Sequence, residues 1–136
     1  MPESNLATIK GFVNAVANQD EDGQFSRMAP DAIITEPEAL PYGGIWRGPE
    51  GWQQLSAQIF GTWEMSRNAG QLRIIGGEDD EYFALSMTLS GISRKTGKPF
   101  EMSLMELWHV VDGQIRSITP HYFDTLAAAR INGDID

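Results

Sequence analysis

Two glutamates, Glu36 and Glu106, stand in segments that otherwise have the composition of buried strands. Glu36 ends the segment 32–36, Glu106 lies within the segment 100–110, and both segments are rich in apolar residues. Because strand side chains alternate between two faces, each carboxyl shares its face with apolar neighbours. Lost hydration raises a glutamate pKa above its ordinary value of about 4.3, so the group can transfer protons near neutral pH. These residues therefore predict general acid–base chemistry.

The two carboxyls are more informative as a pair. If they face one cavity, their pKa values move apart, and one becomes an ionised base while the other stays a protonated donor. Structural alternatives stay open, because Glu36 can form an ion pair with Arg47 and Glu106 can accept hydrogen bonds inside the core. His121, late in the last predicted strand, is the third catalytic candidate, with a hydrogen bond at the strand end as its alternative.

Aromatic side chains are the candidates for lining a ligand cavity. Four tryptophans in so small a domain can surround a ligand, although core packing is the usual role of large aromatic residues. Tyrosine hydroxyls can supply hydrogen bonds at such a site. The predicted ligand-contacting residues are Phe12, Tyr42, Trp46, Trp52, Trp63, Trp108 and Tyr122.

Helical spacing of apolar residues predicts the elements that come first in the chain. Ser4 or Asn5 is placed to cap the first helix, and Pro49 suits the first turn of the third. The glycine-rich segment 41–48 is predicted to be a loop, and a strand precedes it at 32–36. The predicted helices cover residues 6–16, 25–28 and 49–63.

Four strands and a short C-terminal helix or tail are predicted to follow. Asp112-Gly113 is a strong signal for a two-residue hairpin, and Asp124 is placed to cap the last helix. This order predicts the α+β class, with helices packed on one face of a curved antiparallel sheet that encloses a conical pocket. The predicted strands cover residues 71–75, 82–93, 100–111 and 114–123.

Composition limits the partners. The chain has 136 residues, enough for one domain, and a formal charge of -9 that disfavours nucleic acid and anionic membranes. No apolar run is long enough to span a bilayer, and residues 1–5 do not resemble a secretory signal. A cytoplasmic protein is therefore expected.

Bound metals and nucleotide cofactors are not expected either. The chain has no cysteine, and its only histidines, His109 and His121, do not form a paired-histidine motif. The segment 42–48 lacks the Lys and Ser or Thr of a phosphate-binding loop. Any catalysis should therefore use side chains alone.

Four segments carry a resemblance to a known family. They are Asp31–Pro37, Tyr42–Gly48, Leu104–Trp108 with the turn Asp112–Ile115, and His121–Asp124. Their order resembles the nuclear transport factor 2 superfamily, especially its SnoaL-like polyketide cyclases and steroid delta-isomerase-like proteins. The resemblance covers nearly all of residues 1–136, as a single SnoaL-like domain. It implies a cone-shaped, curved antiparallel sheet wrapped around helices, a cystatin-like roll, which commonly forms homodimers through the sheet face turned away from the helices.

The resemblance also implies roles for single residues. Glu36, followed by Pro37, matches the aspartate base of the steroid isomerase branch, and Glu106 matches the acid that stays protonated and binds the dienolate oxygen. The third residue of that branch, a tyrosine on the first helix, aligns with Phe12, which cannot donate a hydrogen bond. Tyr42 or Tyr122 is a candidate replacement.

Other branches of the superfamily match less well. Epoxide hydrolases use one arginine and two aspartates, whose positions fall near Ser86, Thr88 and His121 in this chain. A scytalone-dehydratase-like site requires two converging histidines, whereas His109 is predicted on the strand face opposite Glu106.

The expected function is cofactor-independent isomerisation, cyclisation or dehydration of a small hydrophobic carbonyl compound. Glu36 would remove a proton, while Glu106 and a tyrosine would stabilise the enolate. The alternatives are a non-catalytic ligand-binding or dimeric assembly module, and a structural dimer whose cone is filled.

Overall fold

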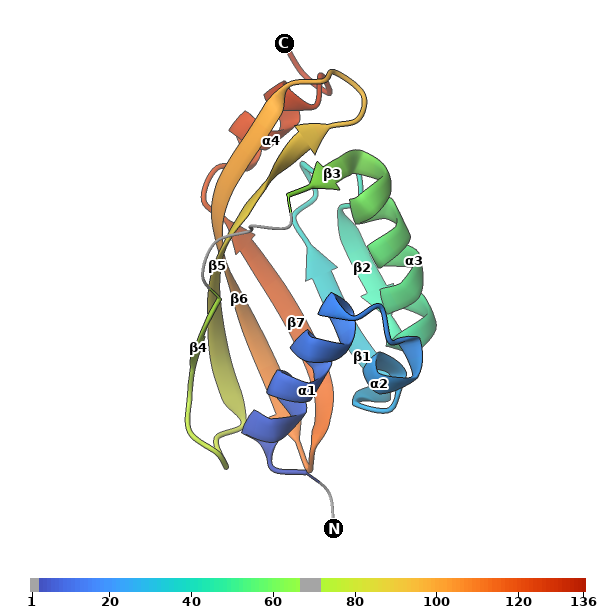
Figure 1. Ribbon diagram of the computed structural model, residues 1–136, viewed down its shortest axis with the longest axis vertical. Coiled ribbons are helices and arrows are strands. Elements are labelled where there is room, and N and C mark those ends of the chain that lie inside the picture. The colour runs from blue at the N-terminus through green and yellow to red at the C-terminus, as the bar shows by residue number, and fades with distance from the viewer. Residues whose placement is uncertain (1–2, 67–71) are drawn as a thin grey trace.

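One strongly curved sheet, with helices α1 and α3 against it, forms the body of the protein (Figure 1). The computed structural model describes residues 3–66 and 72–136. The α+β class is confirmed. The helices are α1 (Asn5–Ala17), α2 (Glu21–Phe25), α3 (Gly48–Thr62) and α4 (Thr125–Ile131), and the strands are β1 (Met28–Glu36), β2 (Gly44–Arg47), β3 (Trp63–Met65), β4 (Arg73–Ile75), β5 (Tyr82–Ser93), β6 (Pro99–Val111) and β7 (Gln114–Tyr122).

The sheet is mixed, whereas the sequence predicted an antiparallel one. Its strands follow the order β2-β1-β7-β6-β5-β3, and β4 also pairs with β5. Strands β1 and β7 are parallel, and the other pairs are antiparallel. Strands β1 and β7 are far apart in sequence, with α3 and the β5–β6 hairpin between them. Because of this long connection, β7 can return beside β1 in the same direction.

Alternation along β6 divides the sheet into an inner face, covered by helices, and an outer face. Phe100, Met102, Leu104, Trp108 and Val110 are buried on the inner face, as the period of two predicts. Strand β1 alternates in the same way, with Ala32, Ile34 and Glu36 buried. Helices α1 and α3 add Ile9, Phe12 and Leu55 to the same core.

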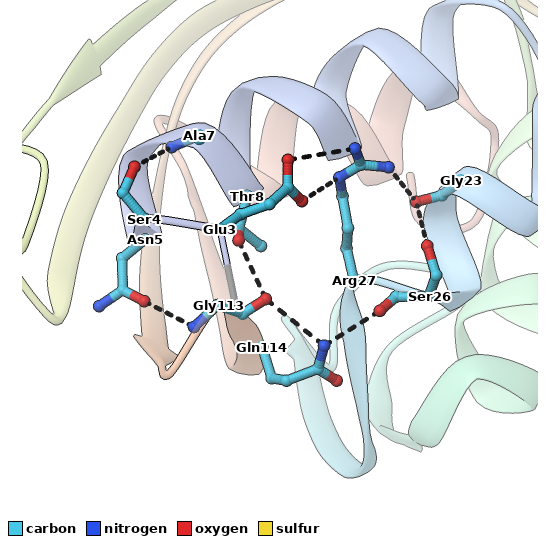
Figure 2. Close-up of polar contacts among 10 residues, drawn as sticks. All are labelled: Glu3, Ser4, Asn5, Ala7, Thr8, Gly23, Ser26, Arg27, Gly113 and Gln114. Carbon is cyan, nitrogen blue, oxygen red and sulfur yellow. Dashed lines mark hydrogen bonds and ion pairs between the residues drawn. The ribbon is translucent and has the colours of Figure 1, made fainter. Parts of the chain in front are cut away.

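Helix α1 is joined to the β6–β7 hairpin by buried polar contacts (Figure 2). Ser4 caps the helix by accepting a hydrogen bond from the Ala7 backbone at 3.1 Å. Asn5 Oδ1 accepts from the Gly113 backbone at 3.0 Å, and Thr8 Oγ1 donates to the Gly113 carbonyl at 2.9 Å. Asn5 Nδ2 also donates to the Val110 carbonyl at 3.1 Å. These bonds fix α1 over the inner face.

Replacing Asn5 by alanine should lower the free energy of unfolding by about 2 kcal/mol, because it leaves buried backbone groups without partners. Urea denaturation would measure the change. Asn14→Ala is the control, because Asn14 is exposed on the same helix and should change the stability by less than about 0.5 kcal/mol. Equal stability of the two variants would show that the Asn5 contacts contribute nothing.

Several predicted boundaries were wrong. Met28 and Pro30 belong to β1, and the short second helix ends at Phe25. Proline is tolerated because Pro30 lies where the β1–β7 register shifts, between Met28 and Ile33. Trp63 begins β3 instead of ending α3. The predicted strand 71–75 is observed from Arg73, and residue 71 lies outside the described residues.

The predicted loop 41–48 contains a strand. Residues 44–47 form β2, in which Ile45 pairs with Thr35 of β1. Its glycines lie at the bends: Gly44 has φ +110° and Gly48 has φ +67°, values that side chains disfavour. At the other end of the chain, Asp124 caps α4 by accepting from the Ala127 backbone at 3.0 Å, as predicted.

Candidate active site

Glu36 and Glu106 lie on the inner face, at the same level of the sheet. Glu106 pairs with Pro120 of β7, and Ile34 pairs with Ile118. Continuing the parallel register by two residues places Glu36 beside Pro120, so a single strand separates the two acids. Adjacent strands lie about 4.8 Å apart, which puts the two backbones roughly 10 Å from each other. We call this level, formed by Leu85, Glu106, Pro120, Glu36 and Gly44, the carboxyl row.

Glu36 is almost completely buried, with 4% of its surface exposed. Its Oε2 is buried and has no hydrogen-bond partner among the described residues. The alternative ion pair with Arg47 is not formed, because Arg47 pairs with Ile33 and lies on the outer face. Burial, and secondarily the charge of Glu106, raises the pKa of Glu36 to about 8.

Glu106 differs from Glu36 in having a hydrogen-bond donor. Trp108 Nε1 donates to Glu106 Oε1 at 3.0 Å. The residue keeps some exposure, yet its carboxyl is desolvated, and this burial raises its pKa to about 7. The Trp108 hydrogen bond acts in the opposite direction, because it stabilises the ionised form. Both acids can therefore change protonation near neutral pH.

Two tyrosine hydroxyls meet beside the acids. The Oη atoms of Tyr42 and Tyr122 are 2.8 Å apart, and Trp63 Nε1 donates to Tyr42 Oη at 3.0 Å. Burial raises the pKa of Tyr42 to about 12. The pKa of Tyr122 is also raised, first by burial and then by Tyr42, Glu36 and Glu106. Tyr122 therefore interacts with both glutamates, and Tyr42 interacts with Glu36.

The other predicted ligand-contacting residues pack around this cluster. Phe12 contacts Trp52 and Trp108, with ring centroids 5.2 Å and 5.5 Å apart. Trp63 stacks on Phe100 at 4.2 Å. These residues come from α1, α3, β3 and β6, and they form the apolar walls beside the acids.

Two of the tryptophans use their indole N–H groups to fix the structure around the site. Trp46 Nε1 donates to the Tyr42 carbonyl at 2.9 Å, and Trp52 Nε1 donates to Gln24 at 2.7 Å. Both side chains are half-buried. The Trp46 bond holds the backbone of Tyr42, whose hydroxyl belongs to the site.

His121 does not join the cluster. It pairs with Met105, lies on the outer face and is exposed, whereas its neighbour Tyr122 lies on the inner face. His109 is also on the outer face, stacked on Tyr82 with centroids 4.4 Å apart. Across residues 3–66 and 72–136, no three His, Asp or Glu side chains are grouped so that they could hold a metal ion. In the same residues, no helix is long and apolar enough to cross a membrane.

Two hollows lined by described residues contain no residue of the carboxyl row. One of about 710 Å³ lies between β3, β5 and β6, and one of about 400 Å³ lies between β2 and α3. The predicted conical pocket around the tryptophans therefore stays a prediction. Incomplete burial nevertheless marks part of the inner face beside the acids, where the half-buried side chains are Met87, Leu89, Glu106 and Tyr122.

Sequence reasoning did not predict the Trp63–Tyr42–Tyr122 chain of hydrogen bonds. It named all three as ligand-contacting residues, but nothing in the sequence joins Tyr42 to a residue 80 positions away. The useful signal was the alternation of β7, which places Tyr122 on the same face as Ile118 and Pro120.

Comparison with known proteins agrees with this architecture. The family model described as SnoaL-like domain matches residues 9–118. The chain belongs to the SnoaL-like domain family. No match was found among the curated proteins.

Solved structures of several other proteins share the fold. A nuclear transport factor 2-like protein from Burkholderia xenovorans is 23% identical, with a TM-score of 0.84, covering 94% of this chain and 95% of that one. A provisionally assigned isomerase from Bacillus subtilis is 14% identical, with a TM-score of 0.75 and coverage of 96% and 94%. A provisionally assigned polyketide cyclase from Xanthomonas campestris pv. campestris is 12% identical, with a TM-score of 0.75 and coverage of 94% and 96%.

At these identities the solved structures establish the fold and not the reaction. The resemblance to SnoaL-like proteins is confirmed, and the chain has the fold of a nuclear transport factor 2-like protein.

Proposed function

We propose that this SnoaL-like protein is a cofactor-independent acid–base catalyst that isomerises, cyclises or dehydrates a small hydrophobic carbonyl compound. The observation that carries the proposal is the carboxyl row, which holds two glutamates on one apolar face. Burial raises their pKa values to about 8 for Glu36 and about 7 for Glu106. Between these values one proton is shared by two acids, so a base and a proton donor are present together.

The tyrosines supply the donor that Phe12 lacks. An enolate that forms in the site needs hydrogen bonds to its oxygen, and the hydroxyls of Tyr42 and Tyr122 lie in the environment of both acids. The Trp63 N–H occupies a lone pair of Tyr42 Oη, and one of the two tyrosine hydroxyls donates to the other, so the second hydroxyl can donate to a substrate oxygen. A preoriented donor of this kind stabilises developing negative charge without reorganising.

The carboxyl row also supports a class of substrate. It carries two acids and no cation, so a neutral molecule is favoured over an anion. Half-buried Met87, Leu89 and Trp52 would bury an apolar framework beside the acids. A ketone with an acidic C–H next to its carbonyl, on a hydrophobic skeleton, combines these features.

Isomerisation of β,γ-unsaturated cyclic ketones tests the proposal, because the conjugated product absorbs in the ultraviolet. We expect turnover with the wild type that the double variant Glu36→Gln/Glu106→Gln loses. The variant Glu38→Gln is the matched control, since Glu38 is exposed and close in sequence to Glu36. Equal turnover by the double variant and the control would refute the assignment of the acids.

A non-catalytic ligand-binding or assembly module is the second candidate. Phe12, buried where the steroid isomerase branch has its tyrosine, favours it. Thermal-shift screening of the same ketones, followed by product analysis, separates the two functions. Stabilisation without any chemical change would support the binding module.

Self-association is proposed for the outer face of the sheet. Met105 and Leu107 of β6 are each 46% exposed there, and Ile45 of β2 is 58% exposed. Exposed apolar side chains gathered on one face indicate an interaction surface, and a second copy of this chain fits the resemblance noted in the sequence.

Sedimentation velocity at micromolar concentration should show a dimer that Leu107→Glu converts to monomer, because it would bury unpaired charges between two copies. Phe60→Glu is the control, because Phe60 is exposed on α3 and not on the outer face of the sheet. The Phe60→Glu variant should remain a dimer. A wild-type protein that is monomeric throughout would contradict the proposal.

A further inference from the structure

We propose that Glu106 carries the negative charge and removes the substrate proton, while Glu36 holds the shared proton and donates it to the substrate oxygen. The assignment rests on the proposed function and reverses the roles that the sequence resemblance implied. Trp108 is then a positioning residue, because its hydrogen bond keeps the negative charge on Glu106. The geometry that carries it is the unequal supply of hydrogen-bond donors to the two carboxyls.

Glu106 has a hydrogen-bond donor that stabilises its ionised form. The indole N–H of Trp108 can donate and cannot accept, so its 3.0 Å bond to Oε1 favours the carboxylate over the carboxylic acid. Hydrogen bonds to an ionised acceptor are stronger than those between neutral groups. The described residues make no hydrogen bond to Oε2, so this oxygen is the one that can accept a proton from a ligand.

Glu36 differs from Glu106 in the hydrogen bonding of its carboxyl. Its Oε2 is buried without a donor, and a carboxylate there would lose hydration without compensation. The protonated acid avoids that cost, and its O–H needs only one acceptor, which a bound carbonyl oxygen would supply. The orphaned oxygen thus marks the place where the substrate completes the site.

The groups around Glu36 also decide how many negative charges the two acids can carry. Glu106 of β6, Tyr122 of β7 and Tyr42 of the β1–β2 loop are the titratable groups that interact with Glu36, and none of them can carry a positive charge. The charged groups of the packed helices, Lys10 on α1 and Glu50 on α3, are exposed to solvent. None of these described groups is a cation that faces the pair and could stabilise a second anion. One negative charge is therefore shared by the two acids, and Trp108 places it on Glu106.

The two glutamates can enolise a ketone without a co-reactant. The Glu106 carboxylate forms an O–H bond as the C–H bond next to the carbonyl breaks, and the released electron pair forms the C=C bond of an enol. The carbonyl π electrons move to oxygen, which takes the proton from Glu36. The products of the step are a neutral enol, protonated Glu106 and ionised Glu36. When Glu106 gives its proton to a different carbon, the enol O–H returns its proton to Glu36, and the isomerised ketone leaves both acids in their starting states.

Infrared titration locates the shared proton without any substrate. The wild type should show a protonated-carboxyl band that disappears in two steps near neutral pH. The step at higher pH should be absent in Glu36→Gln, and the step at lower pH should be absent in Glu106→Gln. Glu101→Gln is the control, because Glu101 is exposed on the outer face of β6, and it should keep both steps.

The Trp108 indole N–H resonance supplies an independent readout. It should shift with the lower step, and Trp108→Phe should move the Glu106 midpoint to higher pH, which a purely structural role for Trp108 does not predict. Exchange of the two infrared assignments would overturn the roles while leaving the acid–base function intact. Absence of both near-neutral steps, together with absence of turnover, would refute the proposed function as well.

Discussion

Glu106→Gln should reduce kcat for an enolisable ketone by about 10³-fold, whereas Glu36→Gln should reduce it by about 10-fold. General-base catalysis contributes typically 10²–10⁴-fold, and a glutamine at position 106 cannot accept the proton. A glutamine at position 36 still has an N–H that can bind the substrate oxygen, so only the proton transfer is lost. Trp108 can donate to the side-chain oxygen of glutamate or of glutamine at position 106, so the packing of the wild type and of Glu106→Gln should be comparable.

Steady-state kinetics over a pH series measures this contrast. In the wild type, the form with ionised Glu106 and protonated Glu36 is most populated between about pH 7 and about pH 8, so kcat/KM should have a maximum there. In Glu36→Gln the fall on the alkaline side should vanish, and the rise on the acid side should remain. A larger loss in Glu36→Gln than in Glu106→Gln would restore the roles implied by the resemblance.

The second large effect is on stability. The pKa of Glu36 is about 8 in the folded protein and 4.5 in the unfolded chain, so the folded state binds this proton more tightly. The resulting stabilisation is complete below about pH 4.5 and is lost as pH rises through about 8. One pKa unit corresponds to about 1.4 kcal/mol, and after allowance for relaxation of the site we expect Glu36 to account for a loss of about 3 kcal/mol.

Urea denaturation at pH 5 and pH 9 measures the loss, and Glu36→Gln isolates its source. The glutamine variant should lose less stability than the wild type between these pH values. The control Glu38→Gln should follow the wild type, because the Glu38 carboxyl is exposed. Parallel profiles for the wild type and Glu36→Gln would mean that Glu36 is solvated and ionises in its ordinary range.

Much of the fold followed from local patterns. The bounds of β5 were predicted from its apolar composition and flanking turns, and β6 differed from the prediction by one residue. The burial of Glu36 followed from its alternation with Ala32 and Ile34. In these strands one face packs against a core, so the sequence period of two has a direct physical cause.

Other features depended on contacts that are distant in sequence. Strand β2 was predicted to be a loop because its flanking glycines are turn residues, and pairing with β1 makes the segment extended. The parallel β1–β7 pair is set by the course of the whole chain and has no local signal.

The candidate site was also predictable where the signal is local and not where it depends on long-range contacts. Glu36 and Glu106 were found because a carboxyl among apolar side chains is unusual, and that signal is local. The face of His121 depended on the register of β7, since a shift of one residue moves a side chain to the opposite face. The Tyr42–Tyr122 contact required the fold itself, and so did the unequal donors of the two acids.

Nuclear magnetic resonance titration of the glutamate carboxyl carbons tests the central claim most directly. Among the glutamates of the folded protein, Glu106 and Glu36 should titrate with midpoints near 7 and 8. Replacing Glu106 by glutamine should lower the midpoint of Glu36, because the charge of Glu106 raises the pKa of Glu36 across one strand. If both carboxyls titrate near 4.5 and neither responds to loss of the other, then the two acids do not form one site.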